Sequence, residues 1–305
     1  MRSPAPASSC AACWPADRAR VHAVNGYRSL GVDIADGVAR VVLDHGDINL
    51  LDGVMFAELA QLVGELAADD AVRVVVLSSA NPDFFIAHFD VSLILRFPTE
   101  RDPAAAEQPN PFHVMCETLR TMPKATIAVI EGRVGGGGSE LALSCDMRFA
   151  RRGGAVFNQP EVALGILPGG SGTVRLPRLI GRSRALEVVL GCDDVDADLA
   201  ERWGWVNRAL DVSELWPHVD RLAERIASFP AHAVAAAKSS VLLADHGIAE
   251  HLRAEGAAFQ ASLGGPGTRD AMQRFLDRGG QTPVGEGRLG ALAGELAAED
   301  HTGPS

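Results

Sequence analysis

Four consecutive glycines at 135–138 stand between a short apolar run and a helical pattern, and this junction constrains the fold most strongly. The run at 126–130 (TIAVI) is rich in β-branched residues and predicts a buried strand. The helical pattern extends from 139 to about 147. Backbone N–H groups at such a helix N-terminus point outward and bind negative charge. The junction therefore predicts an α/β core with a charge-binding turn at the end of a strand.

The spacing of the glycines separates the chemistries that use such a turn. A dinucleotide fingerprint needs GxGxxG, but after Gly135 and Gly137 the third glycine is replaced by Glu140. A P-loop needs a lysine where Gly138 stands. Two interpretations remain open: an oxyanion hole, and a tight strand–helix contact that admits no side chain.

Further apolar patterns extend the α/β arrangement on both sides of the junction. Strands are predicted at 38–43 (VARVVL) and 72–77 (VRVVVL), with a helix at 54–67 between them, and the three form a parallel unit. The second strand is apolar enough to be buried on both faces. After residue 173 the pattern is helical at 173–179, 183–190, 198–203, 213–228, 231–262 and 268–276.

These patterns define the expected organisation of the chain. The Pro-rich stretch 97–111 predicts a loop. Both ends lack an apolar period and are rich in small residues, so we expect them to be disordered. The expected parts are a disordered tail at 1–25, an α/β core at 26–200, a helical C-terminal part at 201–278 and a second disordered tail at 279–305.

Charge and apolar runs limit the possible partners. The net charge is −11, and binding to nucleic acid needs a basic surface, so we expect no nucleic-acid partner. No apolar run reaches the ~18–20 residues of a membrane-spanning helix, so we expect no membrane partner. The first 20 residues lack the apolar core of a signal peptide, and we therefore expect a cytoplasmic protein.

Cysteines and histidines show no pattern of a metal site or a disulfide framework. The five cysteines are odd in number and scattered, and the CxxC of Cys10 and Cys13 has no second pair. His246 and His251 are spaced i, i+5, whereas a helical metal site uses i, i+4. We therefore expect no metal.

Two long stretches of the sequence carry a family resemblance. Residues 123–146 (PKATIAVIEGRVGGGGSELALSCD) and 155–178 (AVFNQPEVALGILPGGSGTVRLPR) resemble the two central motifs of the crotonase superfamily, the enoyl-CoA hydratase/isomerase family. Residues 203–208 (WGWVNR) and 72–90 are similar to further segments of that family, and the likeness runs from about 30 to 280. The resemblance implies a crotonase-like ββα spiral core with a helical C-terminal trimerisation part, assembled as a homotrimer or homohexamer.

The resemblance also implies catalytic residues. Two backbone N–H groups, of Gly137 and Phe89, would form an oxyanion hole for a thioester carbonyl. Glu140 and Glu161 match the family's acid/base pair, and we assign Glu140 as the base that activates water and Glu161 as the acid. Their retention favours hydration of a 2-enoyl-CoA, or the reverse dehydration.

Coenzyme A would enter as part of an acyl-CoA thioester substrate, with no separate cofactor. The resemblance places it against the backbone near Phe85 and Ala87, beside His88, Asp90 and Gly136. Lys238, Arg274 and Arg278 are candidates for its phosphates, and each is equally compatible with an ordinary surface charge.

The loop at 85–90 departs from the family pattern at two positions. His88 stands where glycine is usual and Phe89 where a small residue is usual. His88 either points outward from an altered loop or takes part in the chemistry. Two alternatives to hydration therefore stay open: an enoyl-CoA isomerase or specialised biosynthetic enzyme, and a weakly active acyl-CoA-binding subunit of an assembly.

Overall fold

Two β-sheets form the centre of the computed structural model, which describes residues 26–99 and 110–299. The larger sheet has the strand order β1-β2-β3-β5-β7-β10, in which β1 pairs antiparallel with β2 and the other pairs are parallel. Its strands are β1 (Leu30–Ala35), β2 (Val38–Leu43), β3 (Val74–Ser79), β5 (Ala125–Ile130), β7 (Met147–Arg151) and β10 (Arg208–Leu210). The smaller sheet, in the order β4-β6-β8-β9, contains β4 (Phe84–Ile86), β6 (Arg133–Gly135), β8 (Val156–Asn158) and β9 (Val195–Asp196).

The chain passes repeatedly from the larger sheet to the smaller one. β3 is followed by β4, β5 by β6 and β7 by β8, and each set forms parallel neighbours in its own sheet. This repeated step confirms the predicted crotonase-like spiral core. It also brings the ends of β4, β6 and β8 together, although they are far apart in the sequence.

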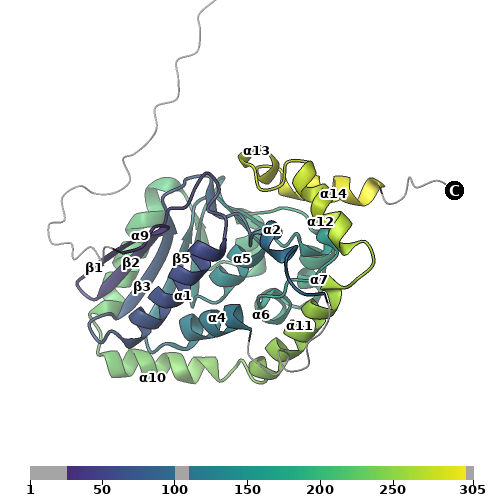
Figure 1. The fold of residues 1–305 in the computed structure, drawn as a ribbon. Helices are drawn as coiled ribbons and strands as arrows, with labels where there is room; N and C mark the ends of the chain where they lie inside the picture. The colour runs from purple at the N-terminus through teal and green to yellow at the C-terminus, as the bar shows by residue number, and fades with distance from the viewer. Residues whose placement is uncertain (1–25, 100–109, 300–305) are drawn as a thin grey trace, which may run out of the picture.

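Helices cover both faces of the larger sheet (Figure 1). α1 (Gly53–Ala68) packs with Val75 and Leu77 of β3, whereas α9 (Val212–Ala227) packs with Val74 and Val76. Successive side chains of a strand point to opposite faces, so β3 is buried on both, as its sequence predicts. The strand β2, the helix α1 and the parallel pairing of β2 with β3 also agree with the prediction.

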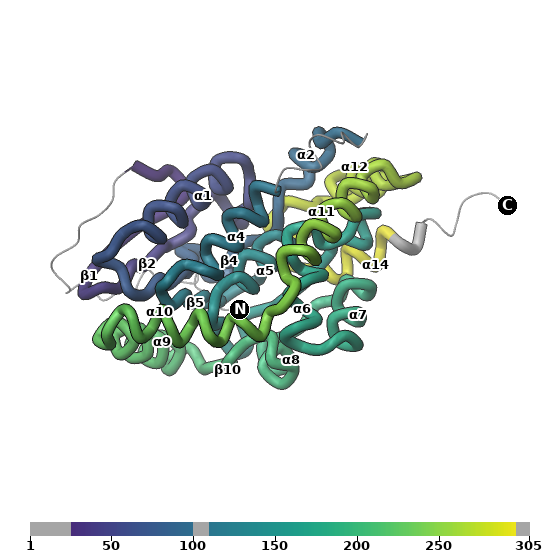
Figure 2. Tube along the Cα trace, turned by 90° about the horizontal axis from the view of Figure 1, so that it is seen from below, coloured from purple at the N-terminus to yellow at the C-terminus, as the bar shows by residue number. Residues whose placement is uncertain are grey.

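The other helices surround this core and its smaller sheet. They are α2 (Val91–Ile94), α4 (Pro111–Thr121), α5 (Gly136–Leu143), the 3₁₀ helix η1 (Glu161–Leu164), α6 (Gly172–Ile180), α7 (Arg182–Gly191), α8 (Ala197–Trp203), α10 (Ala231–Leu242), α11 (Ile248–Leu263), α12 (Thr268–Asp277), α13 (Pro283–Glu286) and α14 (Leu289–Glu299). Seen from below, α10 and α11 run in succession across the molecule towards α12 (Figure 2).

Two predicted helix boundaries differ from the structure, and one predicted loop is mostly untested. The predicted helix at 231–262 is two helices, because Gly247 adopts a left-handed φ of +73° between them. The helix after the glycines ends at Leu143, since residues from Met147 join the larger sheet. Most of the predicted loop at 97–111 lies outside the described residues.

The predicted C-terminal disordered tail is wrong for residues 279–299, which form α13 and α14. Leu289, Leu292 and Leu296 are buried and pack with Leu164 and Phe275. Their i, i+3, i+7 spacing is that of one helix face, which the surrounding Gly and Ala obscured. Residues 1–25 and 300–305 lie outside the described residues. No helix within the described ranges is both long and apolar enough to cross a membrane.

Candidate active site

The glycine turn brings together residues from three distant segments. β6 ends at Gly135 and α5 begins at Gly136, whose φ of +44° is in the left-handed region. A Cβ added to Gly136 would lie 3.0 Å from Oε1 of Glu161 and 3.1 Å from the Cβ of His88. Both the backbone conformation and the crowding therefore require glycine here. The turn is a meeting point of the predicted site residues.

Gly137 and Phe89, whose backbone N–H groups are the predicted oxyanion-hole donors, lie next to each other at this turn. A Cβ added to Gly137 would lie 3.6 Å from the N of Phe89 and 3.2 Å from its Cβ. Gly137 is the second residue of α5, where N–H groups have no acceptor within the helix. Among the described residues, neither N–H donates to a backbone carbonyl. The pair can therefore serve a carbonyl oxygen of a bound ligand.

Leu51 holds the loop that carries the second N–H group. The N–H of Leu51 donates to the carbonyl of His88 (3.0 Å), and the carbonyl of Leu51 accepts from the N–H of Asp90 (3.1 Å). These bonds fix the peptide on each side of Phe89 and leave the N–H of Phe89 unused between them.

Glu140 lies on α5, whose residues are all buried. Its Oε1 accepts hydrogen bonds from the N–H groups of Gly170 (2.8 Å) and Gly172 (2.7 Å). A Cβ on Gly170 would overlap with Oε2 of Glu140. The side chain of Glu140 is therefore held in one orientation by a turn that depends on glycine.

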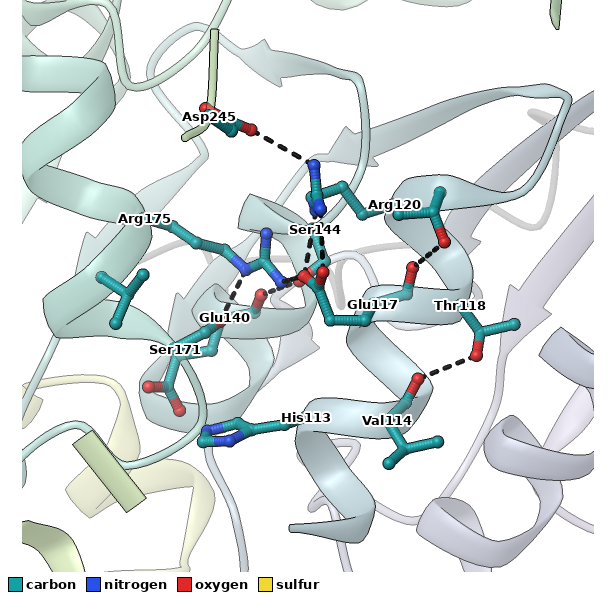
Figure 3. Close-up of polar contacts among 12 residues, drawn as sticks. His113, Val114, Glu117, Thr118, Arg120, Glu140, Ser144, Ser171, Arg175 and Asp245 are labelled. Carbon is teal, nitrogen blue, oxygen red and sulfur yellow. Dashed lines mark hydrogen bonds and ion pairs between the residues drawn. The ribbon is translucent and has the colours of Figure 1, made fainter. Parts of the chain in front are cut away.

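An ion-pair network contacts that turn through Ser171 (Figure 3). Ser171, between the two glycines, has a left-handed φ of +105°, and its Oγ accepts from Nε of Arg175 (2.8 Å). Arg175 is buried and pairs with Glu117 of α4, which also binds Arg120 (2.8 Å). The contact between Arg175 and Glu117 joins residues 58 positions apart, which no local sequence pattern predicts.

Glu161 opens η1 and is buried against Gly136. Its Oε2 has no hydrogen-bond partner among the described residues. Burial raises the pKa of Glu161 to about 7, although its own backbone N–H and the charge of His88 oppose the rise. Burial also raises the pKa of Glu140 well above its usual range, and the charge of Glu161 adds to the effect. Each carboxyl therefore keeps its proton to a higher pH than an exposed glutamate does.

Glu255 is a third buried acid, and sequence reasoning missed it. It lies on α11 and accepts a hydrogen bond from the hydroxyl of Thr173. Its Oε2 is 3.2 Å from Nε2 of His113, which also contacts the carbonyl of Gly169 at 2.8 Å. The charge of Glu255 raises the pKa of both Glu140 and Glu161. A single glutamate within a helical pattern carries no signal that it faces a site.

His88 points inward and does not extend into solvent. Its Nε2 is 2.9 Å from Oε1 of Glu286, and its Nδ1 is 2.8 Å from the carbonyl oxygen of Phe89. Burial lowers the pKa of His88, but the charge and hydrogen bond of Glu286 outweigh it and raise the pKa to about 8. Sequence reasoning missed Glu286 because it lies in the segment expected to be disordered.

The residues expected near coenzyme A are only partly brought together. Phe85 and Ala87 are fully buried in and after β4, beside the turn. Asp90 caps α2 by accepting from the N–H of Ser92 (2.8 Å). Arg278 lies 3.7 Å from Glu295 on α14.

Lys238 is not at the glycine turn. Its ammonium is 2.9 Å from Asp146 and donates to the carbonyl of Lys124 (2.8 Å). Asp146 follows the C-terminal end of α5, whereas the turn is at its N-terminal end, so the helix separates them. The ion pair with Asp146 balances the charge of Lys238, so the position of Lys238 needs no bound ligand to explain it. Within the ranges that the structure describes, no group of three His, Cys, Asp or Glu could hold a metal ion.

Comparisons with known proteins identify relatives of the chain. The profile of the family described as enoyl-CoA hydratase/isomerase matches residues 33–281. The chain is 32% identical to the short-chain-enoyl-CoA hydratase of Clostridium acetobutylicum, over 76% of this chain and 87% of that protein. It is also 32% identical to the crotonyl-CoA hydratase of Syntrophomonas wolfei, over 76% and 88% respectively.

One solved structure matches this chain over the whole length of the solved protein. The crystal structure of a candidate enoyl-CoA hydratase from Streptomyces avermitilis superposes with a TM-score of 0.80 at 38% identity. The match covers 90% of this chain and 100% of the other. The spiral core and the C-terminal helices are therefore shared with a protein of that family.

Proposed function

Because the chain belongs to the enoyl-CoA hydratase/isomerase family, we propose that it adds water to the double bond of a 2-enoyl-CoA thioester, giving the 3-hydroxyacyl-CoA, or catalyses the reverse dehydration. The observation that carries this proposal is the pair of buried carboxyls, Glu140 and Glu161, beside two unused N–H groups. Hydration needs a proton acceptor and a proton donor at one double bond, and one ionised and one protonated carboxyl supply both.

Each group of the site has its own role in the reaction. The thioester carbonyl accepts hydrogen bonds from the N–H groups of Phe89 and Gly137, which stabilise the charge that develops on its oxygen. Glu140 takes a proton from water as the water oxygen bonds to C3, and the electrons of the double bond move into an enolate. Glu161 gives its proton to C2, and the thioester carbonyl re-forms. The net change is the addition of one water molecule.

The assignment of Glu140 as the base has a geometric argument. Its Oε1 accepts two backbone N–H groups, which favour the ionised carboxylate and partly offset the rise in pKa that burial and the charge of Glu161 cause. Glu161 lacks such a pair, and its pKa of about 7 suits a group that gives a proton near neutral pH. The names of the relatives point to short-chain substrates, of which crotonyl-CoA is the one to test first.

We further propose that no cofactor is needed beyond the coenzyme A of the substrate, since the two carboxyls and two N–H groups provide the proton transfers and the charge stabilisation. Treatment with EDTA is expected to leave the rate unchanged.

A cytoplasmic location is supported by Cys116, Cys145 and Cys192, which are buried free thiols. Assembly into a trimer or hexamer is supported by the C-terminal end of α10, where the apolar side chains of Val241 and Leu243 are 72% and 65% exposed. Light scattering after gel filtration tests it.

Loss of the absorbance of the enoyl thioester on mixing purified protein with crotonyl-CoA tests the proposal. Glu140→Gln and Glu161→Gln are each expected to reduce kcat by on the order of a hundredfold or more, because each removes one proton-transfer group. Glu214→Gln, an exposed glutamate on α9, is the control and should keep the wild-type rate. A wild-type protein that binds short, medium and aryl enoyl-CoAs without converting them would favour a binding subunit instead.

A further inference from the structure

The segment between α12 and α14 reaches back to the loop that carries Phe89. Oε1 of Glu286 is 2.9 Å from Nε2 of His88 and accepts from the N–H of Gln281 (2.6 Å). Nε2 of Gln281 donates to Oδ1 of Asp90 (2.7 Å). The residues on both sides of Phe89 are therefore bound by one short stretch of chain, 281–286, almost 200 positions away.

The contacts of His88 identify its charge state. Both ring nitrogens face acceptors, namely the carboxylate of Glu286 and the carbonyl of Phe89. Only the imidazolium can donate to both. The side chains are 5% and 0% exposed, so this is a buried ion pair. Removing one partner of such a pair leaves an uncompensated buried charge.

The groups around His88 come from several elements. Glu286 of α13 and Glu161 of η1 act on it electrostatically, and the ring of Phe275 on α12 lies 5.6 Å away at its edge. The charge of Arg133 on β6 acts on Glu286 and favours its ionised form. The positive charge of His88 thus lies next to the proposed oxyanion hole, and the carboxylate of Glu286 in the C-terminal segment balances it.

The backbone of the segment is held in an unfavourable conformation. Gln281 has a φ of +63°, in the left-handed region that disfavours residues with a side chain. In this conformation the backbone N–H of Gln281 donates to Glu286 and its side-chain amide donates to Asp90. Glycine would adopt this backbone more easily but would lack the bond to Asp90.

We propose that residues 281–286 form a C-terminal clamp that fixes the N–H of Phe89 in the oxyanion hole, with His88, Glu286 and Gln281 as positioning residues. The clamp holds the carbonyl of Phe89 through His88 and the side chain of Asp90 through Gln281, while Leu51 holds the backbone on the other side. A donor fixed in advance stabilises the enolate without reorganisation during the reaction. The inference rests on the proposed function, because it assigns the clamp to the same oxyanion hole.

Steady-state kinetics with crotonyl-CoA on three variants test the clamp. Glu286→Gln, His88→Gln and Gln281→Gly are each expected to lower kcat by on the order of tenfold or more, with KM nearly unchanged, because the N–H acts mainly in the transition state. The double variant of His88 and Glu286 should be no slower than the slower single one. Glu295→Gln, an exposed glutamate on α14, is the matched control and should keep the wild-type kcat.

Gln281→Gly separates positioning from folding. A purely structural role predicts that glycine, which suits the φ of +63°, preserves both the melting temperature and the rate. The clamp predicts a preserved melting temperature and a reduced kcat. Wild-type kcat in Gln281→Gly and in Glu286→Gln would overturn the proposal, even if His88→Gln fails to fold.

A second measurement does not depend on turnover. Acetoacetyl-CoA ionises to an enolate that resembles the charge-bearing intermediate, and its ultraviolet absorption reports the ionised fraction when bound. The wild-type protein is expected to bind a larger enolate fraction than Glu286→Gln. Equal fractions would overturn the clamp. A wild-type protein inactive on enoyl-CoA thioesters would contradict the proposed function alone, and the acetoacetyl-CoA comparison would still decide the clamp.

Discussion

At the scale of single residues, the site depends on glycines that no other residue can replace without strain and on carboxyls that are buried. Gly136 combines a positive φ with close contacts to Glu161 and His88. Glu140 and Glu161 are 3% and 8% exposed and lack full charge compensation, which raises the pKa of both carboxyls. Each feature is unfavourable for folding, as is common where a protein must do chemistry.

Gly136→Ala is predicted to abolish most activity and to destabilise the fold by about 1 kcal/mol or more. The methyl group would lie 3.0 Å from Oε1 of Glu161 and would also force a strained φ. Gly153→Ala is a matched control, because Gly153 has a φ of +69° but nothing within 4 Å of its added Cβ. Thermal melts and crotonyl-CoA kinetics of both variants check this. Comparable activity in the two variants would show that contact with Glu161 does not matter.

Glu161→Gln is predicted to raise stability at pH 8 but not at pH 5. The folded pKa of about 7 lies above the ordinary value of 4.5, so ionisation favours the unfolded chain as pH rises from 4.5 through 7. The amide removes a penalty on the order of 3 kcal/mol above that range. Urea unfolding at the two pH values measures it. An equal effect of the substitution at pH 5 and pH 8 would contradict a raised pKa.

At the scale of elements, the C-terminal helices contribute more than their composition indicates. α14 packs Leu289, Leu292 and Leu296 against η1 and α12, and α13 places Glu286 on His88. The pair α13–α14 therefore connects the outer helices to the loop that carries Phe89.

Leu292→Ala is predicted to destabilise the fold by about 2–5 kcal/mol, because Leu292 is fully buried and the cavity would not close. Val284→Ala on neighbouring α13 is the control, since Val284 is 80% exposed and should change stability by less than about 0.5 kcal/mol. Denaturant unfolding of both variants measures the difference. If Leu292→Ala is as stable as Val284→Ala, α14 does not belong to the cooperative core.

Elements with a strong apolar period could be predicted from the sequence, and weakly patterned ones could not. The strand β2 and the helices α1 and α12 follow clear apolar patterns. β4, β6 and β8 have three residues each, too few for any periodicity. α14 shows a helix face only when its leucines are counted apart from the intervening Gly and Ala.

The same contrast holds for the site. Gly136, Gly137 and Glu140 are neighbours in sequence, so local spacing indicated their association. Glu255 and Glu286 reach the site through contacts across more than 80 positions, which no local pattern records.

At the scale of the whole molecule, the spiral gathers the site from segments between residues 51 and 286. β4 and β6 end where Phe89 and Gly137 meet, η1 adds Glu161, and the C-terminal segment completes the loop. Glu161 lies next to Gly136 and the N–H of Phe89 next to Gly137, on the turn that leads into the helix of Glu140.

The most direct test of this account is mass spectrometry of the product formed from crotonyl-CoA in ¹⁸O-labelled water. The account predicts that the wild-type protein adds one labelled water to the substrate, and that Glu140→Gln and Glu161→Gln form this product far more slowly. A product of unchanged mass would indicate isomerisation in place of hydration. Labelled product formed at the wild-type rate by either variant would contradict the assignment of the two glutamates.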